Sequence, residues 1–549
     1  MAELLVSSLD EDESFYLADI EVKGGTSMGI NLGTLFTKAA RTFPERLAIA
    51  YGDYELTYQQ ANERINKVAN ALLSLGIKKG ENVAIVLHNC PEFIEILFAC
   101  FKAGIGTVPI NFRLHPKECA FIIDNSEAVA VALGDDFRDS LYALKSEMPR
   151  VKHYICVAKP LEGMLHYETL IKDKSSTFVD VDVERDDLAW LFYTSGTTGQ
   201  PKGAMLTHHV LMIMTMNFFA DITPLGPDDV ILHAAPLSHG SGIYGIPNVA
   251  KGAANVILHV KTFDPKTVFE TIQRRKVTNM FMAPAMIKRL VTSPEIDKYD
   301  LSSIKCINYG GAPIYVEDLK EAVRKMGQVF VQLFGQAECP MTISYLRKEE
   351  HLLEGTEEEM KRLTSAGIPR TDVDVKIFDD NDNELPPGRM GEIVVRGEVM
   401  MKGYWRNPKA TAETLRGGWV HTGDLGIMDE KGYVYILDRA KDMIISGGEN
   451  IYSREIEDVI VKHPAVHEVA VIGVPDQTWG EAIKAIVSLK PGKKATREEI
   501  INFCKDHLAS YKKPKSVEFI AEIPKNPYGK VLKRELREKY WVGEARRVR

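Results

Sequence analysis

The stretch Tyr193-Thr194-Ser195-Gly196-Thr197-Thr198-Gly199-Gln200-Pro201-Lys202-Gly203 decides how this sequence is interpreted. It holds three glycines, four Ser or Thr hydroxyls and one lysine, and it follows the apolar run 188–192, which predicts a buried strand. The backbone N–H groups of such a loop can face oxyanions, and the lysine adds a positive charge. Since Gly203 follows Lys202, the spacing differs from the Walker A pattern. The stretch therefore predicts a phosphate-binding loop after a strand.

The sequence on both sides of this loop alternates between helical and strand patterns. Thr57 with Gln60 indicates a capping box, and apolar residues then recur at helical spacing until Gly76. Short apolar runs at 83–87, 107–110 and 128–133 predict strands between helices. Strands that alternate with helices form parallel sheets covered on both faces. The expected fold class is α/β.

A chain of 549 residues is too long for one compact core, so more than one domain is expected. We place a boundary near Lys441, in the polar break after a strand. Residues 1–440 are expected to form a large N-terminal domain, with 1–28 as an extension, and 441–549 a small, mobile α+β domain. In the small domain, helices are predicted at 453–462 and 497–507, and strands at 469–474 and 482–489.

Composition excludes several classes of protein. The net charge of −8 argues against a general nucleic-acid binder. Seven scattered cysteines without a CxxC pair suggest neither a disulfide framework nor a zinc site, and reduced thiols fit a cytoplasmic protein. The acidic residues 10–13 do not suit a signal peptide. The apolar stretch 94–110 is interrupted by Glu95 and Lys102, so it predicts a buried helix–turn–strand and no integral membrane segment.

Five further motifs follow the phosphate loop in order along the chain. They are Tyr309-Gly310-Gly311-Ala312-Pro313, Phe334-Gly335-Gln336-Ala337-Glu338, Trp419-Val420-His421-Thr422-Gly423-Asp424, the stretch DRAKDMIISGGENIY at 438–452, and Pro524-Lys525-Asn526-Pro527-Tyr528-Gly529-Lys530-Val531-Leu532-Lys533. Together with the loop they resemble the adenylate-forming superfamily, over about residues 30 to 540. That superfamily contains acyl-CoA synthetases, amino-acid adenylation domains and firefly-type luciferases.

The resemblance implies a site for ATP and Mg²⁺. Asp424 would receive the two ribose hydroxyls, which suits a carboxylate because it only accepts hydrogen bonds when ionised. Glu338 and Thr194 would hold Mg²⁺, a cation that prefers oxygen ligands. Thr194, Lys202, Glu338 and Lys530 would be the catalytic residues. The implied ATP and AMP contacts are Thr194, Ser195, Gly196, Thr197, Thr198, Gly199, Lys202, Gly310, Gly311, Ala312, Gln332, Phe334, Gly335, Gln336, Ala337, Asp424, Ile436, Arg439 and Lys530.

Two positions depart from the family pattern usually written Tyr-Gly-x-Thr-Glu. Phe334 lacks the phenol, and Ala337 lacks the hydroxyl that often contacts the α-phosphate. ATP binding is still expected, whereas that particular hydrogen bond is in question.

The remaining residues implied by the resemblance concern the acid, coenzyme A and movement. The small domain would rotate about Lys441, and Gly447 and Gly448 would let the pantetheine arm approach the backbone. Lys513 and Lys515, in the basic stretch 511–515, would meet the phosphates of CoA. The acid pocket would be formed by His239, Gly240, Ser241 and Gly311. Alternatively, His239 is a packed core histidine.

These expectations describe an acid–CoA ligase. ATP and a carboxylic acid would give acyl-AMP and pyrophosphate, and CoA would then give acyl-CoA and AMP. The acid is expected to be a medium-chain fatty, aromatic or alicyclic acid. Two alternatives stay open: an acyl- or amino-acid-adenylating enzyme with another acceptor, and a luciferase-like oxygenase. The stretch 236–244 has no aspartate to pair with a substrate amine. The partners expected are these small molecules, with a homodimer left open. The charged run 349–362 is interpreted as a solvated helical face.

Overall fold

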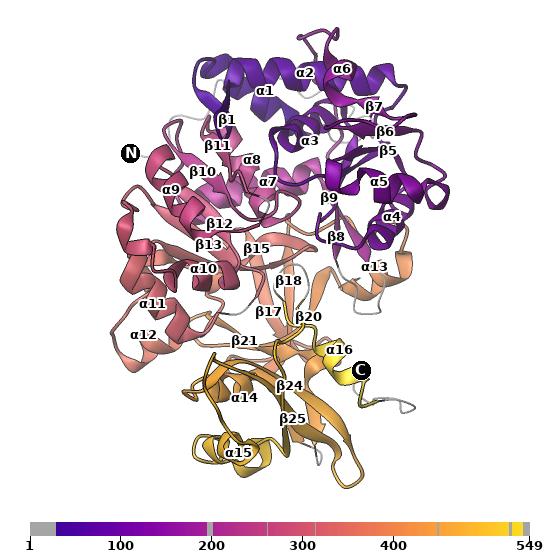
Figure 1. Ribbon diagram of the computed structural model, residues 1–549. Coiled ribbons are helices and arrows are strands. Elements are labelled where there is room, and N and C mark those ends of the chain that lie inside the picture. The colour runs from indigo at the N-terminus through magenta and orange to yellow at the C-terminus, as the bar shows by residue number, and fades with distance from the viewer. Residues whose placement is uncertain are drawn as a thin grey trace, which may run out of the picture.

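The computed structural model describes residues 29–194, 201–260, 262–312, 314–446, 449–525 and 530–541, with the backbone alone at Ala440 and Asn450. The strands form four sheets, three of them built from β1 to β21 and the fourth from β22 to β26. In Figure 1 the first three sheets and their helices form the larger, upper part of the molecule. The fourth sheet lies below them with α14 and α15, in orange and yellow. This arrangement confirms the predicted α/β class, with a large N-terminal domain and a smaller C-terminal one.

The sheet that leads into the phosphate loop has seven strands in the order β7-β6-β5-β3-β4-β8-β9. All neighbours pair in parallel except β9, which runs antiparallel to β8. The apolar runs predicted from the sequence are its buried central strands, as expected when helices cover both faces. Their bounds are β3 (Asn82–Val86), β4 (Gly106–Pro109), β5 (Ala128–Leu133), β6 (His153–Cys156), β7 (Leu165–His166), β8 (Leu188–Thr194) and β9 (Lys202–Thr207).

A second sheet has nine strands in the order β16-β15-β14-β13-β12-β10-β11-β1-β2. Its central strands are parallel, and β2, β15 and β16 pair antiparallel at the two ends. The bounds are β1 (Leu47–Tyr51), β2 (Tyr54–Thr57), β10 (Val230–His233), β11 (Ala254–Ile257), β12 (Asn279–Met282), β13 (Cys306–Gly310), β14 (Phe330–Gln336), β15 (Cys339–Leu346) and β16 (Ile368–Pro369).

Helices pack against these sheets through apolar faces. The capping box at Thr57 and Gln60 is confirmed at the start of α2 (Tyr58–Ser74), whose buried residues face α1 (Gly33–Thr42) and α3 (Pro91–Ala103). The other helices of the large domain are α4 (Pro116–Asn125), α5 (Asp135–Ala143), α6 (Tyr167–Ile171), α7 (His208–Asp221), α8 (Gly240–Ala250), α9 (Pro265–Arg275), α10 (Pro284–Val291), α11 (Val316–Met326), α12 (Glu357–Arg362) and α13 (Pro408–Thr414), with 3₁₀ turns Lys145–Glu147, Ile296–Lys298 and Lys348–Glu350.

The third and fourth sheets flank the predicted domain boundary. The third is antiparallel and ends with β21 at Arg439; the fourth begins with β22 at Ile444, and the 3₁₀ turn Ala440–Asp442 lies between them. The third sheet consists of β17 (Val373–Phe378), β18 (Met390–Gly397), β19 (Leu415–Arg416), β20 (Trp419–Met428) and β21 (Val434–Arg439). The fourth consists of β22 (Ile444–Ser446), β23 (Glu449–Ile451), β24 (Val466–Asp476), β25 (Gly480–Leu489) and β26 (Ser516–Phe519), with α14 (Ser453–Ile460), α15 (Arg497–Lys505), the 3₁₀ turn Ser510–Lys512 and α16 (Lys533–Glu538).

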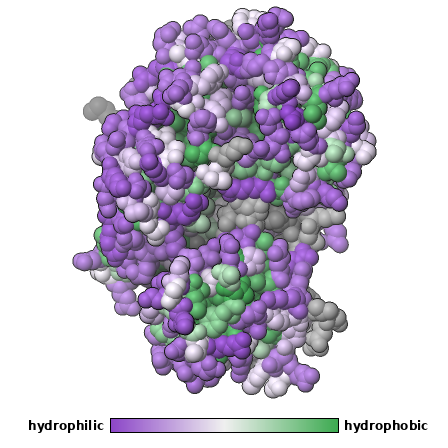
Figure 2. Space-filling model, viewed as in Figure 1, coloured by the Kyte–Doolittle hydropathy of each residue, from purple (hydrophilic) through white to green (hydrophobic). Residues whose placement is uncertain are grey.

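The surface in Figure 2 is mostly polar, and the broadest hydrophobic area in that view lies on the small domain. Among the described helices, none is both long enough and apolar enough to cross a membrane. The stretch 94–110 forms most of α3 and all of β4, and both elements are buried in the large domain. This confirms the helix–turn–strand expected there.

Candidate active site

The phosphate loop connects two paired strands. Thr194 at the end of β8 is the register partner of Lys202 at the start of β9. Ser195, Gly196, Thr197, Thr198 and Gly199 lie outside the described residues. Because the β8–β9 ladder continues through Leu188 and Thr207, both ends of the loop are fixed. Lys202 therefore has a defined place beside Thr194.

A segment from elsewhere in the large domain pairs with β9 and brings an aromatic side chain to this lysine. Met205 N donates to Gly403 O at 2.9 Å, and Trp405 N donates to Gly203 O at 2.8 Å. Tyr404, between these two contacts, places its ring 5.1 Å from Lys202 Nζ and donates its hydroxyl hydrogen bond to the Glu338 carboxylate. Gly403 has φ +140°, a conformation that favours glycine.

Lys202, Tyr404 and Glu338 thus form one cluster at the end of the phosphate loop. Glu338 is 9% exposed, and its backbone carbonyl accepts from Met401 N at 2.8 Å. Burial and the neighbouring Glu338 charge raise the pKa of Tyr404 well above its usual range, which keeps the phenol protonated as a donor. Tyr404 was not among the residues that the sequence motifs predicted for the site.

The donors at this cluster fit a magnesium ion. A carboxylate at Glu338 and a hydroxyl at Thr194 supply oxygen, and Mg²⁺ takes one or two carboxylates together with substrate phosphates. Among the described residues there is no group of three or more His, Cys, Asp or Glu side chains that could hold a metal by themselves. The donor set therefore suits a cation that arrives with phosphates.

The ends of β13 and β14 are shaped by close backbone contacts. A Cβ at Gly310 would lie 2.4 Å from Leu333 O, and Gly311 has φ +79° with open space around it. A Cβ at Gly335 would meet the Met341 backbone at 2.5 Å. The described part of this motif ends at Ala312, because Pro313 lies outside the described residues, and Gln332 pairs with Tyr309. Gly310 and Gly335 therefore permit close backbone packing, whereas the space beside Gly311 is open.

The two departures from the family pattern lie in buried surroundings. The Phe334 ring is 8% exposed and packs in an apolar cluster with Cys339 and Ile343. Ala337 is also 8% exposed.

Asp424 is a buried carboxylate surrounded by donors and cations. It is 5% exposed, and Gln336 Nε2 donates to its Oδ2 at 2.7 Å. Arg439 Nε lies 3.4 Å from its Oδ1. Burial raises the pKa of Asp424, and the charges of Arg439 and Lys530 act against that rise. Ile436, two residues before Asp438 on β21, pairs with Gly426 beside this site.

Lys530, from the C-terminal lysine motif, belongs to the same electrostatic cluster. Burial and the charge of Arg439 lower the pKa of Lys530 to about 7, while Asp424 acts to raise it. Lys441 has its pKa lowered by burial and by Arg439. Lys530 and Asp424, which are 106 residues apart in sequence, thus influence each other's charge in the folded protein.

Contacts across the 440–443 turn hold the small domain in this orientation. Asp438 Oδ2 accepts hydrogen bonds from Ser453 N at 2.7 Å and Ser453 Oγ at 2.6 Å. The Arg454 guanidinium lies 4.9 Å from the centre of the Tyr315 ring. Arg537 Nη1, from α16, donates to Asp442 Oδ1 at 3.1 Å. The contacts of Asp438 with Ser453 and of Tyr315 with Arg454 join elements on the two sides of Lys441, whereas Arg537 and Asp442 both follow it.

The lysines expected to meet CoA lie on the small domain. Lys515 is exposed, with its Nζ 5.3 Å from the Trp479 ring, and Lys513 is half-buried. Lys512, beside them, pairs with both carboxylate oxygens of Glu455 at 2.7 Å. Gly447 and Gly448 lie outside the described residues.

The segment expected to bind the acid includes His239, which directly precedes α8. His239 caps α8, shares a 2.9 Å hydrogen bond with Ser238 Oγ, and packs edge-on against Phe192 at 5.0 Å. Burial, followed by the nearby Arg113 charge, lowers the pKa of His239 to about 3. A Cβ at Gly240 would lie 2.8 Å from the Phe281 ring, so glycine permits this close packing.

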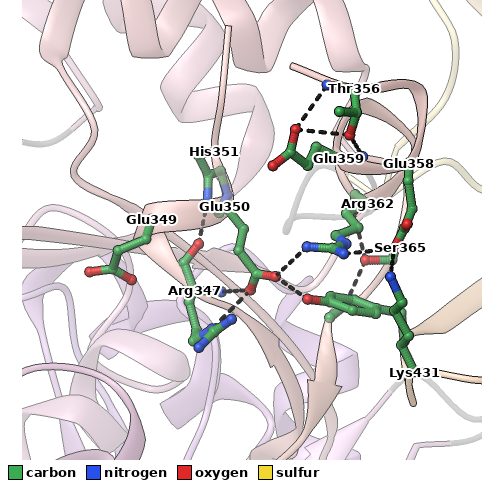
Figure 3. Close-up of polar contacts among 12 residues, drawn as sticks. Arg347, Glu349, Glu350, His351, Thr356, Glu358, Glu359, Arg362, Ser365 and Lys431 are labelled. Atoms are coloured by element: carbon green, nitrogen blue, oxygen red, sulfur yellow. Dashed lines mark hydrogen bonds and ion pairs between the residues drawn. The ribbon is translucent and has the colours of Figure 1, made fainter. Parts of the chain in front are cut away.

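The run 349–362 differs from the expected solvated helix. Its helix α12 covers only Glu357–Arg362, and Glu350 and His351 are buried. Figure 3 shows Glu350 between Arg347 and Arg362. Tyr433 also donates to the Glu350 carboxylate.

His351, next to Glu350, contacts the motif 309–313 at the end of β13. The Tyr309 hydroxyl and His351 Nε2 share a 2.9 Å hydrogen bond. Tyr309 directly precedes Gly310 in the chain. Burial lowers the pKa of His351 to about 4, so the ring is neutral. The segment therefore supports the end of β13, and only part of it is a solvated face.

Comparison with known proteins agrees with this arrangement. The AMP-binding enzyme family matches residues 36–405, and the AMP-binding enzyme C-terminal domain matches residues 455–530. A feruloyl-CoA synthase of Amycolatopsis sp. is 38% identical over 511 residues, which cover 93% of this chain and 99% of that protein.

Two other similar proteins extend the comparison. A fatty acid–[acyl-carrier-protein] ligase of Streptomyces coeruleorubidus is 34% identical over 503 residues, covering 90% of this chain and 93% of that protein. The crystal structure of an anthranilate CoA ligase in complex with anthranoyl-AMP matches with a TM-score of 0.85 and 26% identity, covering 93% of this chain and 97% of the other. The chain belongs to the AMP-binding enzyme family, as an AMP-forming acid–CoA ligase of the adenylate-forming superfamily.

Proposed function

We propose that this enzyme activates a medium-chain fatty, aromatic or alicyclic acid in two steps at one site, with the small domain turning about Lys441 between them. The carrying observation is that the charge of Lys530, on the small domain, acts on the buried Asp424 carboxylate of the large domain, which itself pairs with Arg439 at 3.4 Å. The boundary that we propose at 440/441 lies between the last residue of the third sheet, Arg439, and the first residue of the fourth, Ile444.

In the first step an oxygen of the acid attacks the α-phosphorus of ATP. The bond between that phosphorus and the bridging oxygen to the β-phosphate breaks, and pyrophosphate leaves with the electron pair. Asp424 holds the ribose hydroxyls, while Lys530 offsets negative charge between the carboxylate and the α-phosphate. Lys202 attracts the departing pyrophosphate. Positioning and charge stabilisation suffice, since no covalent intermediate with the protein is needed.

Glu338 and Thr194 would hold a magnesium ion with the phosphates. The ion would supply positive charge to the phosphate oxygens during bond cleavage. The Tyr404 hydroxyl orients the Glu338 carboxylate, because it is hydrogen-bonded to it inside the protein. Tyr404 also keeps Lys202 beside this carboxylate through its ring.

In the second step the thiol sulfur of CoA, as thiolate, attacks the acyl carbonyl and AMP leaves. Gly447 and Gly448 would leave room for the pantetheine arm, and Lys513 and Lys515 would bind the nucleotide phosphates of CoA. Lys515 is exposed and therefore accessible to a ligand.

The acid pocket would include His239, Gly240, Ser241 and Gly311. His239 is neutral and ring-packed, so it offers a wall and no charge to pair with a second carboxylate on the acid. Ser241 is fully buried, and its hydroxyl shares a 2.9 Å hydrogen bond with His233 Nδ1. The similar proteins act on feruloyl, fatty acyl and anthranoyl groups, which supports a largely apolar acid.

Isotope exchange between pyrophosphate and ATP tests the first step. A panel of octanoate, ferulate, benzoate and cyclohexanecarboxylate is supplied with ATP and Mg²⁺ but without CoA. Exchange is expected with every acid that releases AMP when CoA is added. An acid that is turned over with CoA but gives no exchange without it contradicts the two-step order.

The acceptor is tested by identifying the thioester. With CoA we expect equal amounts of AMP and acyl-CoA. Transfer to a phosphopantetheinyl carrier protein at a higher kcat/KM than to CoA would favour the alternative acceptor, and light emission with oxygen would favour the oxygenase.

A further inference from the structure

The carboxylate proposed to bind the ribose lies on an irregular turn within a strand pair. Glu392 on β18 pairs with Leu425 on β20, and Val394 pairs with His421. Thr422, Gly423 and Asp424 therefore stand together opposite Ile393. Such bulges redirect a side chain and interrupt the ladder, so other groups must satisfy the backbone of the turn.

Glu392 satisfies the turn from the β18 side. Its Oε1 accepts a 2.9 Å hydrogen bond from Gly423 N, and its Oε2 lies 2.8 Å from His421 Nδ1. Arg416 Nη2 adds an ion pair with Glu392 at 3.4 Å. The Glu392 carboxylate thus holds both Gly423 and His421, two residues just before Asp424.

Gln336 holds the turn from the β14 side. Its amide nitrogen donates to Thr422 O at 3.0 Å and to Asp424 Oδ2 at 2.7 Å. A terminal amide has two N–H donors, and both are therefore used on this turn. Gln336 occupies the variable position of the Phe-Gly-Gln-Ala-Glu motif, where a methionine of similar length would supply no N–H group.

Thr422 completes the arrangement between these two side chains. Its Oγ donates to Ile393 O at 2.6 Å and accepts from Asp424 N at 3.1 Å. The Gly423 backbone adopts φ +68°, which suits glycine. The Asp424 carboxylate keeps acceptor capacity beyond Gln336, since two ionised oxygens offer about four lone-pair sites.

We propose that Gln336 and Glu392 form a two-sided clamp that sets the position and orientation of Asp424, and are positioning residues for the nucleotide ribose. Gln336 fixes one carboxylate oxygen directly, and Glu392 fixes the backbone that carries the carboxylate. The other carboxylate oxygen is then aimed at the ribose diol. This inference rests on the proposed contact between Asp424 and the ribose.

The test compares two nucleotides that differ only in the ribose hydroxyls. Titration calorimetry gives the Kd of ATP and of 2′,3′-dideoxy-ATP with Mg²⁺, for the full chain and for Gln336→Met and Glu392→Met. Each substitution keeps an unbranched side chain of similar length. Matched controls are Gln328→Met, two residues before β14, and Glu384→Met. The Gln328 amide donates to Glu349 O at 3.0 Å, and Glu384 pairs with Lys376 on β17.

Each clamp variant should weaken ATP binding about tenfold, as loss of a hydrogen bond to a charged group can. Binding of dideoxy-ATP should change less than about twofold, because without the diol the position of Asp424 has no partner to act on. The controls should leave both Kd values unchanged. Thermal unfolding of every variant checks that the fold is retained.

Equal weakening of both nucleotides in a folded clamp variant, or no weakening of ATP, overturns the clamp. Failure of the underlying proposal is separately visible. If the unsubstituted enzyme binds ATP and dideoxy-ATP equally, and Asp424→Asn alters neither Kd, the ribose contact itself is wrong. If the unsubstituted enzyme prefers ATP to dideoxy-ATP and Asp424→Asn removes that preference, but the clamp variants keep it, only the clamp is overturned.

Discussion

Tyr404 donates its hydroxyl hydrogen bond to the Glu338 carboxylate, and the two residues come from segments 66 positions apart in sequence. Glu338 follows β14, while Tyr404 lies in a segment that pairs with β9 behind the phosphate loop. The pair therefore links the proposed magnesium carboxylate to the strand that begins with Lys202.

Replacing Tyr404 by Phe should weaken the response to magnesium. Loss of a hydrogen bond that orients a metal ligand typically lowers metal affinity or activity about 10- to 100-fold. We expect the Mg²⁺ concentration for half-maximal pyrophosphate exchange to rise by at least about tenfold. Tyr142→Phe, which removes a hydroxyl bonded to Glu162 O at 3.2 Å, is the matched control. An unchanged Mg²⁺ dependence in Tyr404→Phe contradicts the assigned role.

The pH dependence of adenylation should report Lys530. Its pKa is lowered to about 7 by burial and by Arg439, so the free enzyme loses this cation as pH rises above that value. Because kcat/KM reports the free enzyme, kcat/KM for ATP should fall above about pH 7, approaching tenfold per pH unit. Lys530→Arg should flatten this decline, since a guanidinium stays protonated. The same decline in both enzymes would assign it to another group.

Lys530 and Gly448 should serve different half-reactions. Lys530→Ala should slow formation of acyl-AMP about 10²- to 10³-fold, as loss of a charge stabiliser can, and spare thioester formation from synthetic acyl-AMP. Gly448→Leu should do the reverse by blocking the pantetheine arm. Both variants are assayed in both half-reactions. Loss of the same half-reaction in both would favour a single fixed orientation of the small domain.

Glu350→Gln should destabilise the fold more than Glu349→Gln, its exposed neighbour. Burial acts to raise the pKa of Glu350, but hydrogen bonds from Arg347 and Tyr433 outweigh it and lower this pKa. The stabilisation is therefore present above the unfolded pKa and is lost as pH falls through the folded one. Urea unfolding at pH 7 should show a loss of about 1–3 kcal/mol.

The difference between Glu350→Gln and the unsubstituted protein should shrink below about pH 4, near the ordinary glutamate pKa. A difference that stays constant down to pH 3 would show that packing, and not the carboxylate charge, is responsible. Glu349→Gln should follow the unsubstituted protein throughout.

Local patterns predicted much of the fold because their cause is local. The run 128–133 matches β5 residue for residue, and the Thr57 capping box forms as expected. The charged run 349–362 could not be interpreted in this way. Buried Glu350 accepts a hydrogen bond from Tyr433, which lies 83 residues later and directly before β21, and nothing in the run itself signals that partner.

In the candidate site, too, local motifs were predicted and contacts between distant residues were not. The glycine-rich loop identified Lys202 from sequence, and the register of β8 and β9 then placed it beside Thr194. Tyr404 and Glu392 escaped notice because each acts through a residue distant in sequence. Their roles depend on strand pairing, which a single sequence does not specify.

The two hydrogen bonds from Ser453 to Asp438 have a kinetic consequence. Asp438 precedes Lys441 in the chain and Ser453 follows it, so the proposed turn about Lys441 would separate the two. Asp438 is only 8% exposed, and its carboxylate has to find water or new donors before the turn is complete. Two orientations related by the proposed turn would therefore be discrete wells with a barrier between them, and their exchange should slow steeply on cooling.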